Sequence, residues 1–539
     1  MKKYLLLFSL VMLASCETVK TSMRTLASVK PKNYIITIHG LSGSPQSFGG
    51  LLPALEEHLS QINPNYEYIG KEFKYSSGQK GAEIERFVSE FENYLIKEIP
   101  VLNDGDRISI VAHSQGGLVG YIWYLKTLDG VDLKQKAYME KVNGFVTLSS
   151  PFWGSRTTFL LKQFIPSEYV QNFIYENFNF GDQEVTDITA ASEKIYDYFS
   201  KMASKTSVNS YYDPRMLNVI AVVPETKGDE LKKGFLNSIF SDLKKQFVKI
   251  FDYRLNVGSR WESDQAVNVS SGRLGFYYYS DTIVQNITGE KKANIEMPDF
   301  EYSRFFKTDP KVIYVEGVHA NVGSYPNYAV AEVPDICIEP DKCQHPTYIH
   351  ILKHLANCDD AKNLCRMDRY NNIVKQLEVA REPLSKESSE SIHSELRTFN
   401  LALDINFPKN FIPPKELLDS GSVMKFLQVE YLNGNDPKKQ LAVAQRDGLI
   451  KSISPINFQI RLGRFREWGS RIVNYSAERN QLNIQITGNV QSAGGPEKAI
   501  DVNKKYPLQM IINIPGLKKR KMVIPLQPSY TTFLDLQLD

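Results

Sequence analysis

The chain reads Val111-Ala112-His113-Ser114-Gln115-Gly116-Gly117 at the junction of two segments with opposite patterns. Residues 107–112 form a short β-branched apolar run, which is typical of a buried strand. Residues 117–128 have the pattern of a helix. A serine on such a strand-to-helix turn carries its hydroxyl above the sheet in a strained backbone conformation, as an exposed nucleophile does. We therefore predict that Ser114 is a nucleophile.

The same strand pattern recurs on both sides of this turn. Four more short apolar runs are predicted to be strands: residues 34–39, 142–148, 216–223 and 311–315. Helical patterns separate them, for example over residues 82–95. Strands that alternate with helices imply a mostly parallel sheet that is covered on both faces. The sequence thus predicts an α/β domain.

The pattern changes near residue 380. Residues 383–391 are polar and rich in serine, which predicts a linker over residues 381–397. Several later segments alternate between apolar and polar residues, as residues 482–487 do. A period of two is typical of half-buried antiparallel strands. Residues 398–539 are therefore predicted to form a separate all-β, sandwich-like domain.

The N-terminus has the layout of an export signal. Two lysines precede an apolar run over residues 4–14, which is shorter than the roughly 20 residues that a membrane-spanning helix needs. Leu13-Ala14-Ser15-Cys16 resembles the bacterial lipobox, in which the cysteine is acylated. We expect a signal peptide over residues 1–15, a lipid-anchored Cys16 and a tether over residues 16–32. A plain secretory signal is the alternative.

This N-terminal sequence predicts an exported protein anchored to a bacterial membrane, either the outer membrane or the cell surface. The chain has 539 residues, enough for two or three domains. Its 64 Lys and Arg residues nearly balance its 61 Asp and Glu residues. Because a net charge of +3 provides no basic footprint, we do not expect a nucleic-acid partner. Nothing in the sequence points to a particular oligomeric state.

Four cysteines remain if Cys16 is lipidated: Cys337, Cys343, Cys358 and Cys365. Three pairings are possible, and proximity in sequence favours joining the first to the second and the third to the fourth. A zinc site is the competing interpretation, because His345, His350 and His354 lie nearby. An oxidising compartment and spacings unlike those of zinc knuckles favour disulfides.

From residue 34 to about residue 355 the chain resembles an α/β-hydrolase of the lipase type. The motifs that carry the resemblance are Ile38-His39-Gly40-Leu41, the Ser114 turn, Leu148-Ser-Ser-Pro-Phe-Trp-Gly154 and Ser263-Asp264-Gln-Ala-Val-Asn-Val-Ser-Ser271. Ala112 stands where the family usually has glycine. The resemblance implies a catalytic domain over residues 33–380 with helical, lid-like insertions at residues 155–212 and 224–260. It also implies that the backbone amides of Leu41 and Gln115 form the oxyanion hole.

A serine nucleophile needs a base, and the base needs an acid that orients it. In this fold the order along the chain is serine, acid, histidine. Asp264 matches the acid position of the lipase pattern, although Gln265 replaces the glycine that usually follows it. Glu262 is the second candidate for the acid.

The base is predicted from its place after the last strand. His319 stands just past residues 311–315, where the following loop reaches the nucleophile. His345 is the rival, at the start of a predicted helix over residues 347–355. We favour His319, and we expect the cysteine pairs to brace the segment that carries it.

Together these residues predict a serine carboxylester hydrolase, a lipase or phospholipase that forms an acyl-enzyme and needs no metal or cofactor. Three features point to an acyl-ester or lipid substrate: the predicted anchor, the Phe- and Leu-rich insertions, and Phe152 with Trp153 as apolar lining. The alternatives are an acyltransferase and a non-catalytic surface lipoprotein that binds a ligand or partner.

Overall fold

The computed structural model describes residues 30–128, 132–156, 158, 182–204, 215–223, 262–264, 266–280, 311–319, 328–359, 364–382, 387–419, 421–430, 458–462, 471–492 and 500–539. The predicted signal peptide, Cys16 and most of the tether lie outside these residues, as does the insertion over residues 224–260. Within the described ranges, no helix combines the length and apolar character that crossing a membrane requires.

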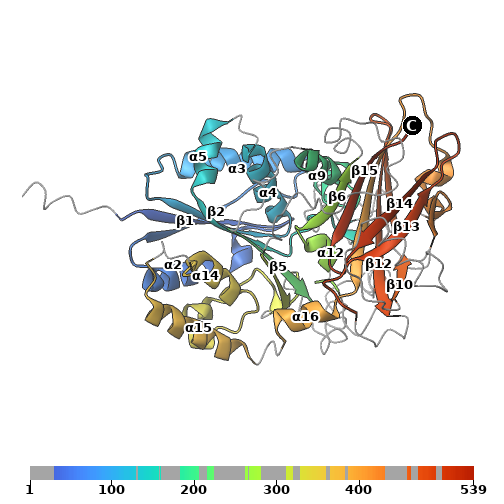
Figure 1. Ribbon diagram of the computed structural model, residues 1–539. Helices are drawn as coiled ribbons and strands as arrows, with labels where there is room; N and C mark the ends of the chain where they lie inside the picture. The colour runs from blue at the N-terminus through green and yellow to red at the C-terminus, as the bar shows by residue number, and fades with distance from the viewer. Residues whose placement is uncertain are drawn as a thin grey trace, which may run out of the picture.

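The first sheet has six parallel strands in the order β2-β1-β3-β4-β5-β7 (Figure 1). Five of them are the predicted strands: β1 (Lys32–Ile38), β3 (Arg107–His113), β4 (Val142–Leu148), β5 (Met216–Val222) and β7 (Lys311–Glu316). The sixth, β2 (Glu67–Phe73), was not predicted. It lies at the edge, where its charged and half-exposed residues give no apolar run.

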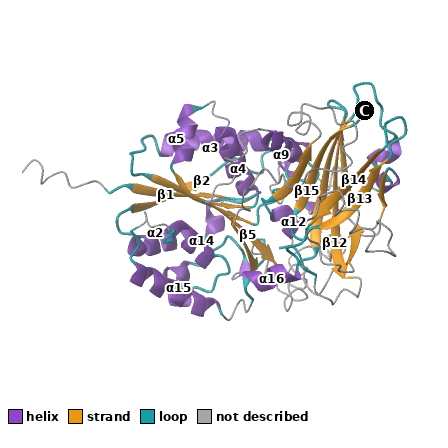
Figure 2. Cartoon of the chain, viewed as in Figure 1, coloured by secondary structure: helices purple, strands orange, loops and turns teal. Residues whose placement is uncertain are grey.

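Helices cover both faces of this sheet, as predicted (Figure 2). On one face lie α3 (Ile84–Glu98), α4 (Gln115–Leu128) and α5 (Leu133–Glu140). On the other lie α2 (Leu51–Ile62), α14 (Tyr348–Ala356) and α15 (Met367–Arg381). Neighbouring residues of β1 point into different cores, Ile35 into one and Ile36 into the other, because side chains alternate along a strand.

The C-terminal part forms two further sheets. The second sheet has the order β10-β12-β8-β15-β6 with β11 beside β12, and the third has the order β14-β13-β9. Their apolar faces share one core, to which β8 contributes Leu401 and β13 contributes Met510. The strands are β6 (Phe276–Ser280), β8 (Thr398–Asn406), β9 (Leu427–Glu430), β10 (Phe458–Leu462), β11 (Arg471–Ser476), β12 (Gln481–Ser492), β13 (Tyr506–Ile512), β14 (Arg520–Leu526) and β15 (Thr531–Gln537).

Two features of this sandwich differ from the prediction. β15 pairs in parallel with β8 and with β6, so the strands are not all antiparallel. β6 comes from the chain before residue 380, so the sandwich is not separate from the α/β part. The alternating pattern identifies strands but does not identify their partners, which are set by contacts between distant segments.

The predicted linker is partly helical. α16 (Ser389–Glu395) lies within residues 381–397 and packs against β7. The Ser388 hydroxyl accepts a hydrogen bond from the Ser391 amide, which caps the helix, and Ile392 is fully buried. Serines that suggested a linker therefore begin a helix, and Ser389 accepts a hydrogen bond from the Tyr314 amide of β7.

The described part of the first insertion lies between the two halves of the molecule. It forms α8 (Asp182–Asp187) and α9 (Glu193–Ser204). Phe199 of α9 stacks on Trp153 at 4.3 Å, and the Tyr196 hydroxyl donates to the carbonyl of Ile484 in β12 at 2.9 Å. Phe152 and Trp153 are fully buried here, so the prediction that they line a substrate pocket is wrong.

The remaining short helices connect these layers. They are η1 (Pro45–Phe48), α12 (Val269–Gly272), η5 (Asp335–Ile338), η6 (Pro340–Lys342), η7 (Lys415–Leu418) and η8 (Val423–Lys425). Figure 1 shows α12 between the first sheet and the second. This position matters for the candidate site, because α12 ends the loop that carries Asp264.

Candidate active site

Ser114 lies on the sharp turn between β3 and α4. Its φ of 54° is in the left-handed region, which residues other than glycine rarely adopt. The turn is tight because the backbone of Gly116 approaches β1: a Cβ atom there would lie 2.3 Å from the Ile38 carbonyl oxygen. A Cβ atom on Gly117 would likewise lie 1.8 Å from the Ser150 hydroxyl oxygen. The two glycines therefore permit the strained turn predicted from the sequence.

His319 and Asp264 meet at this serine. His319 follows β7, and its Nε2 atom lies 2.8 Å from the Ser114 hydroxyl oxygen. Its Nδ1 atom lies 2.8 Å from Oδ2 of Asp264. The structure thus brings the three predicted residues into one hydrogen-bonded chain. Since Asp264 accepts from Nδ1–H when the ring is neutral, Nε2 is left to accept the serine proton.

The Asp264 carboxylate is fully buried and held from several directions. Its Oδ1 atom accepts from the amides of Val267 at 2.7 Å and Ala266 at 3.0 Å, which leaves Oδ2 for the histidine. The amide of His319 also donates to the Asp264 carbonyl at 3.0 Å. The loops that carry the acid and the base therefore hold each other in place.

The second candidate for the acid does not reach this site. Glu262 is buried and accepts hydrogen bonds from the amides of Arg397 and Thr398, each at 2.8 Å. It also accepts from the Thr398 hydroxyl at 2.5 Å. Burial raises the pKa of Glu262 to about 7. Glu262 is part of the Asp264 loop (residues 262–264 and 266–272) and connects this loop to the start of β8.

The rival histidine is also structural. His345 Nε2 lies 2.8 Å from the Ala329 carbonyl oxygen, while Nδ1 lies 3.2 Å from the Thr347 hydroxyl. Burial lowers the pKa of His345 to about 4. The side chain therefore holds the start of α14, and His319 alone of the two candidates contacts Ser114.

The peptides predicted to bind an oxyanion lie next to the serine. A Cβ atom on Gly40 would lie 2.7 Å from Cβ of Ser114, so the backbone before Leu41 passes directly against the nucleophile. Gln115 begins α4, and the first amide of a helix has no acceptor within the helix. Both amides are thus near Ser114, and the oxyanion role remains a prediction.

Two residues that contact this site, Tyr75 and His113, were not predicted from the sequence. The Tyr75 ring stacks on His39 at 4.2 Å, and its hydroxyl lies 2.8 Å from the His39 carbonyl oxygen. The ring of His113 lies 4.8 Å from that of His319, and burial together with the charge of His319 lowers the pKa of His113 well below its usual value. His113 precedes the nucleophile in the quoted stretch, which was the available signal.

The cysteines form the two predicted disulfides, Cys337–Cys343 and Cys358–Cys365. The zinc interpretation is wrong, because the histidines nearby have other partners: His350 contacts Arg381 and His354 contacts the Arg215 carbonyl. No group of three His, Cys, Asp or Glu side chains in the described part of the chain is arranged to hold a metal.

Comparison with known proteins supports the ester-hydrolase interpretation of this geometry. Residues 28–180 match the family model described as "Putative serine esterase (DUF676)". This match includes β1, the Ser114 turn and β4, but not Asp264 or His319. No curated protein has a sequence that matches this chain.

Solved structures give the fold over almost the whole chain. Phospholipase PlaB from Legionella pneumophila, in complex with thio-NAD, is similar with a TM-score of 0.50 at 14% identity, over 94% of this chain and 93% of that one. The mature lipase BlEst2 from Bacillus licheniformis has a TM-score of 0.29 at 14% identity, over 46% and 80% of the two chains. The similarity to the first structure shows that this chain has an α/β-hydrolase fold followed by a mostly antiparallel β-sandwich.

Proposed function

We propose that this protein is a serine carboxylester hydrolase that uses Ser114, His319 and Asp264. The observation that carries the proposal is the unbroken chain of hydrogen bonds from the Ser114 hydroxyl through the imidazole to a buried carboxylate, each 2.8 Å long. The match of residues 28–180 to a serine esterase family model supports the same reaction class.

The reaction follows from this arrangement. The Ser114 oxygen attacks the ester carbonyl carbon as His319 Nε2 takes the hydroxyl proton. The amides of Leu41 and Gln115 stabilise the negative oxygen of the tetrahedral intermediate, and each such donor is worth roughly 3 kcal/mol. His319 then returns the proton to the departing alcohol. A water molecule, deprotonated by the same imidazole, releases the acid from the acyl-enzyme.

For the substrate we propose an acyl ester of a lipid, which makes the protein a lipase or phospholipase. The support is the lipobox-like sequence ending at Cys16, which would tether the enzyme to a membrane, and a fold shared with a phospholipase. The proposal therefore includes export and lipid anchoring at a bacterial membrane. Of the lid-like insertions expected at residues 155–212 and 224–260, the second and residues 159–181 and 205–212 of the first lie outside the described residues.

A chain-length series of chromogenic acyl esters tests this proposal. The protein without residues 1–16 should hydrolyse them, Ser114→Ala should abolish turnover, and Ser89→Ala, an exposed serine on α3, should leave it unchanged. Phosphatidylcholine vesicles and soluble short-chain esters compare activity with and without an interface. No turnover dependent on Ser114 would favour a binding lipoprotein, and acyl products on an acceptor other than water would favour an acyltransferase.

A further inference from the structure

The backbone around Leu41 forms a strained turn, here called the Gly40 turn (residues 40–43). The amide of Gly43 donates to the carbonyl of Gly40 at 3.0 Å, which closes the turn. Ser42, in the third position, has a φ of 54°. A positive φ at this position is usual for glycine and strained for serine. The orientation of the Leu41 peptide therefore depends on whatever holds Ser42 in this conformation.

A hydrogen bond to a serine of another segment holds Ser42 in this conformation. The amide of Ser42 donates to the hydroxyl oxygen of Ser77 at 2.9 Å. The Ser77 hydroxyl in turn donates to Oε1 of Glu184 at 2.6 Å, and the amide of Gly78 donates to Oε2 at 2.6 Å. Glu184 is fully buried on α8. A buried carboxyl group with directional partners is a strong constraint, because breaking one of these hydrogen bonds leaves a buried polar group unsatisfied.

The segment that carries Ser77 also contacts His39, the residue directly before the Gly40 turn. This Tyr75 strap (residues 75–78) follows β2, and its first ring stacks on His39 directly before the turn. The Tyr75 hydroxyl also lies 3.1 Å from Oε1 of Gln115, the residue that provides the other predicted oxyanion donor. The strap thus contacts both sides of the predicted oxyanion hole.

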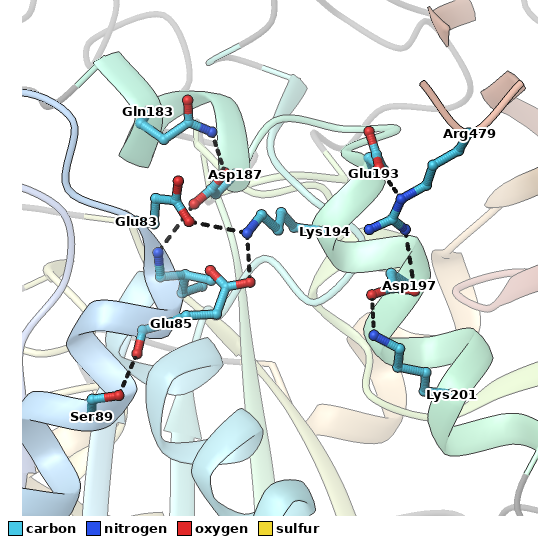
Figure 3. Close-up of polar contacts among 11 residues, drawn as sticks. Glu83, Glu85, Ser89, Gln183, Asp187, Glu193, Lys194, Asp197, Lys201 and Arg479 are labelled. Atoms are coloured by element: carbon cyan, nitrogen blue, oxygen red, sulfur yellow. Dashed lines mark hydrogen bonds and ion pairs between the residues drawn. The ribbon is translucent and has the colours of Figure 1, made fainter. Parts of the chain in front are cut away.

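The helix that carries Glu184 is itself fastened to the α/β part, as Figure 3 shows. Asp187 accepts a hydrogen bond from the amide of Ile84 at 3.1 Å and so binds α8 to the start of α3. Lys194 at the start of α9 forms ion pairs with Glu83 and Glu85 at 3.1 and 2.6 Å. These contacts fix the position of α8, so that Glu184 can hold the Tyr75 strap in place.

We propose that Glu184 is a positioning residue for the oxyanion hole, acting through Ser77 on the Gly40 turn. This inference rests on the proposed function, because it assigns a role to the Leu41 amide in ester hydrolysis. It extends that function by making the first insertion part of the oxyanion machinery: if α8 moves, the Leu41 amide loses its alignment with the developing charge.

Ser77→Ala tests the proposal, with Ser76→Ala as the matched control. Ser76 is on the same strap, but its hydroxyl donates to Glu90 at 2.7 Å instead of Glu184. For Ser77→Ala we expect kcat to fall about tenfold with KM unchanged, because a misaligned donor loses part of what a deleted donor would. The inhibition constant of an alkyl boronic acid, whose tetrahedral adduct mimics the oxyanion, should rise by a similar factor. Ser76→Ala should change neither.

A fluorophosphonate titration of reactive serines separates positioning from folding. If Ser77→Ala lowers only the titratable fraction, while kcat per titrated site and the boronic acid constant stay at wild-type values, the residue is structural and the proposal fails. Glu184→Gln, which keeps one acceptor but turns the other atom into a donor facing the Gly78 amide, should shift kcat and the boronic acid constant in the same direction.

The outcomes also separate this inference from the proposed function. Turnover that requires Ser114 but is insensitive to Ser77→Ala and Glu184→Gln overturns the positioning role alone. A wild-type protein that neither hydrolyses esters nor binds the boronic acid overturns both.

Discussion

The first and second sheets of this molecule differ in where their polar residues lie. In the first sheet both faces are mostly apolar, the buried polar residues within its strands are few, and the polar residues of the candidate site follow the carboxyl ends of β1, β3 and β7. In the second sheet one face is apolar, and the other carries buried polar residues such as Asn400, Asp404 and Gln485. The first sheet positions the residues of the candidate site at the ends of its strands. The second sheet forms hydrogen bonds that support the loops around this site.

The support reaches the Asp264 loop from the second sheet. Glu262 accepts from both amides at the start of β8, and the hydroxyl of Thr531 in β15 donates to the Ser270 carbonyl at 3.0 Å. Gln485 of β12 donates to the Trp153 carbonyl at 3.1 Å. This difference teaches that a polar face in an alternating strand need not face water, since it can face another part of the same chain.

The largest expected effect lies in the first sheet. Ser114→Ala and His319→Ala should each lower kcat for ester hydrolysis by more than about 10⁴-fold, because they remove the nucleophile and the base. The free energy of unfolding should change little for Ser114→Ala, which removes a single hydroxyl, but should fall for His319→Ala, because Oδ2 of the buried Asp264 then loses its partner. Kinetics with a chromogenic ester and urea unfolding measure the two effects. A variant with more than a hundredth of wild-type activity would contradict this assignment of the chemistry.

The second largest effect should be a loss of stability where the first half of the molecule packs against the second sheet. Trp153→Ala removes a fully buried indole that stacks on Phe199 and contacts Phe533 of β15 at 5.3 Å. We expect the free energy of unfolding to fall by about 3 to 5 kcal/mol. Leu133→Ala, at a side chain that is 78% exposed, is the control and should cost less than about 0.5 kcal/mol. Equal effects of both variants would mean that the indole does not join the two halves.

A buried carboxyl in the second sheet should make stability depend on pH. Burial, followed by the charge of Asp535 opposite it on β15, raises the pKa of Asp404 to about 7. The unfolded chain releases this proton at lower pH than the native protein does, so stability falls as the pH rises from about 4 to about 7. Asp404→Asn keeps the acceptor for Gln481 and should be more stable than wild type by about 2 kcal/mol at pH 8.

Urea unfolding at pH 4, 6 and 8 measures this difference. Near pH 4 the two proteins should be similarly stable, because the native carboxyl is then protonated and, close to the ordinary Asp pKa of about 3.9, roughly half of the unfolded chains carry the same proton. A constant difference across the range would show that the side-chain amide, and not the charge, changed the stability.

The smallest effect should come from the exposed ion pairs at the same interface. Arg479 pairs with Glu193 at 2.8 Å and Asp197 at 3.4 Å on α9, and Figure 3 shows it reaching across from the second sheet. Because the arginine side chain is 48% exposed, Arg479→Ala should cost less than about 1 kcal/mol. A loss as large as that of Trp153→Ala would mean that charge, not aromatic packing, holds α9 in place.

The sequence was sufficient to predict the strands whose apolar runs are buried. The five predicted strands of the first sheet are all present, and the residues expected to meet at Ser114 do meet. They could be predicted because the carboxyl ends of parallel strands converge, so a residue just after a strand has a known place. β2 was missed for the corresponding reason: as an edge strand it contains charged and half-exposed residues and has no apolar run.

Long-range pairing could not be predicted. Nothing within residues 276–280 distinguishes a strand of the first sheet from one of the second, and only β15 decides the matter. Tyr75 and Glu184 were missed similarly, since the contact of Tyr75 with His39 and that of Glu184 with Ser77 join segments far apart in sequence. Local patterns carry no signal for such contacts.

The position of β15 has a consequence for the order in which the protein folds. Thr531 and Ser270 form a contact across 261 positions of the chain, and β6 at the edge of the second sheet has β15 as its partner among the described strands. The described strands of the first sheet all precede residue 317, so this sheet can form before β15 pairs. The loop that orients the proposed base would gain its final support only when β15 joins β6 and β8, which would make full activity a late event in folding.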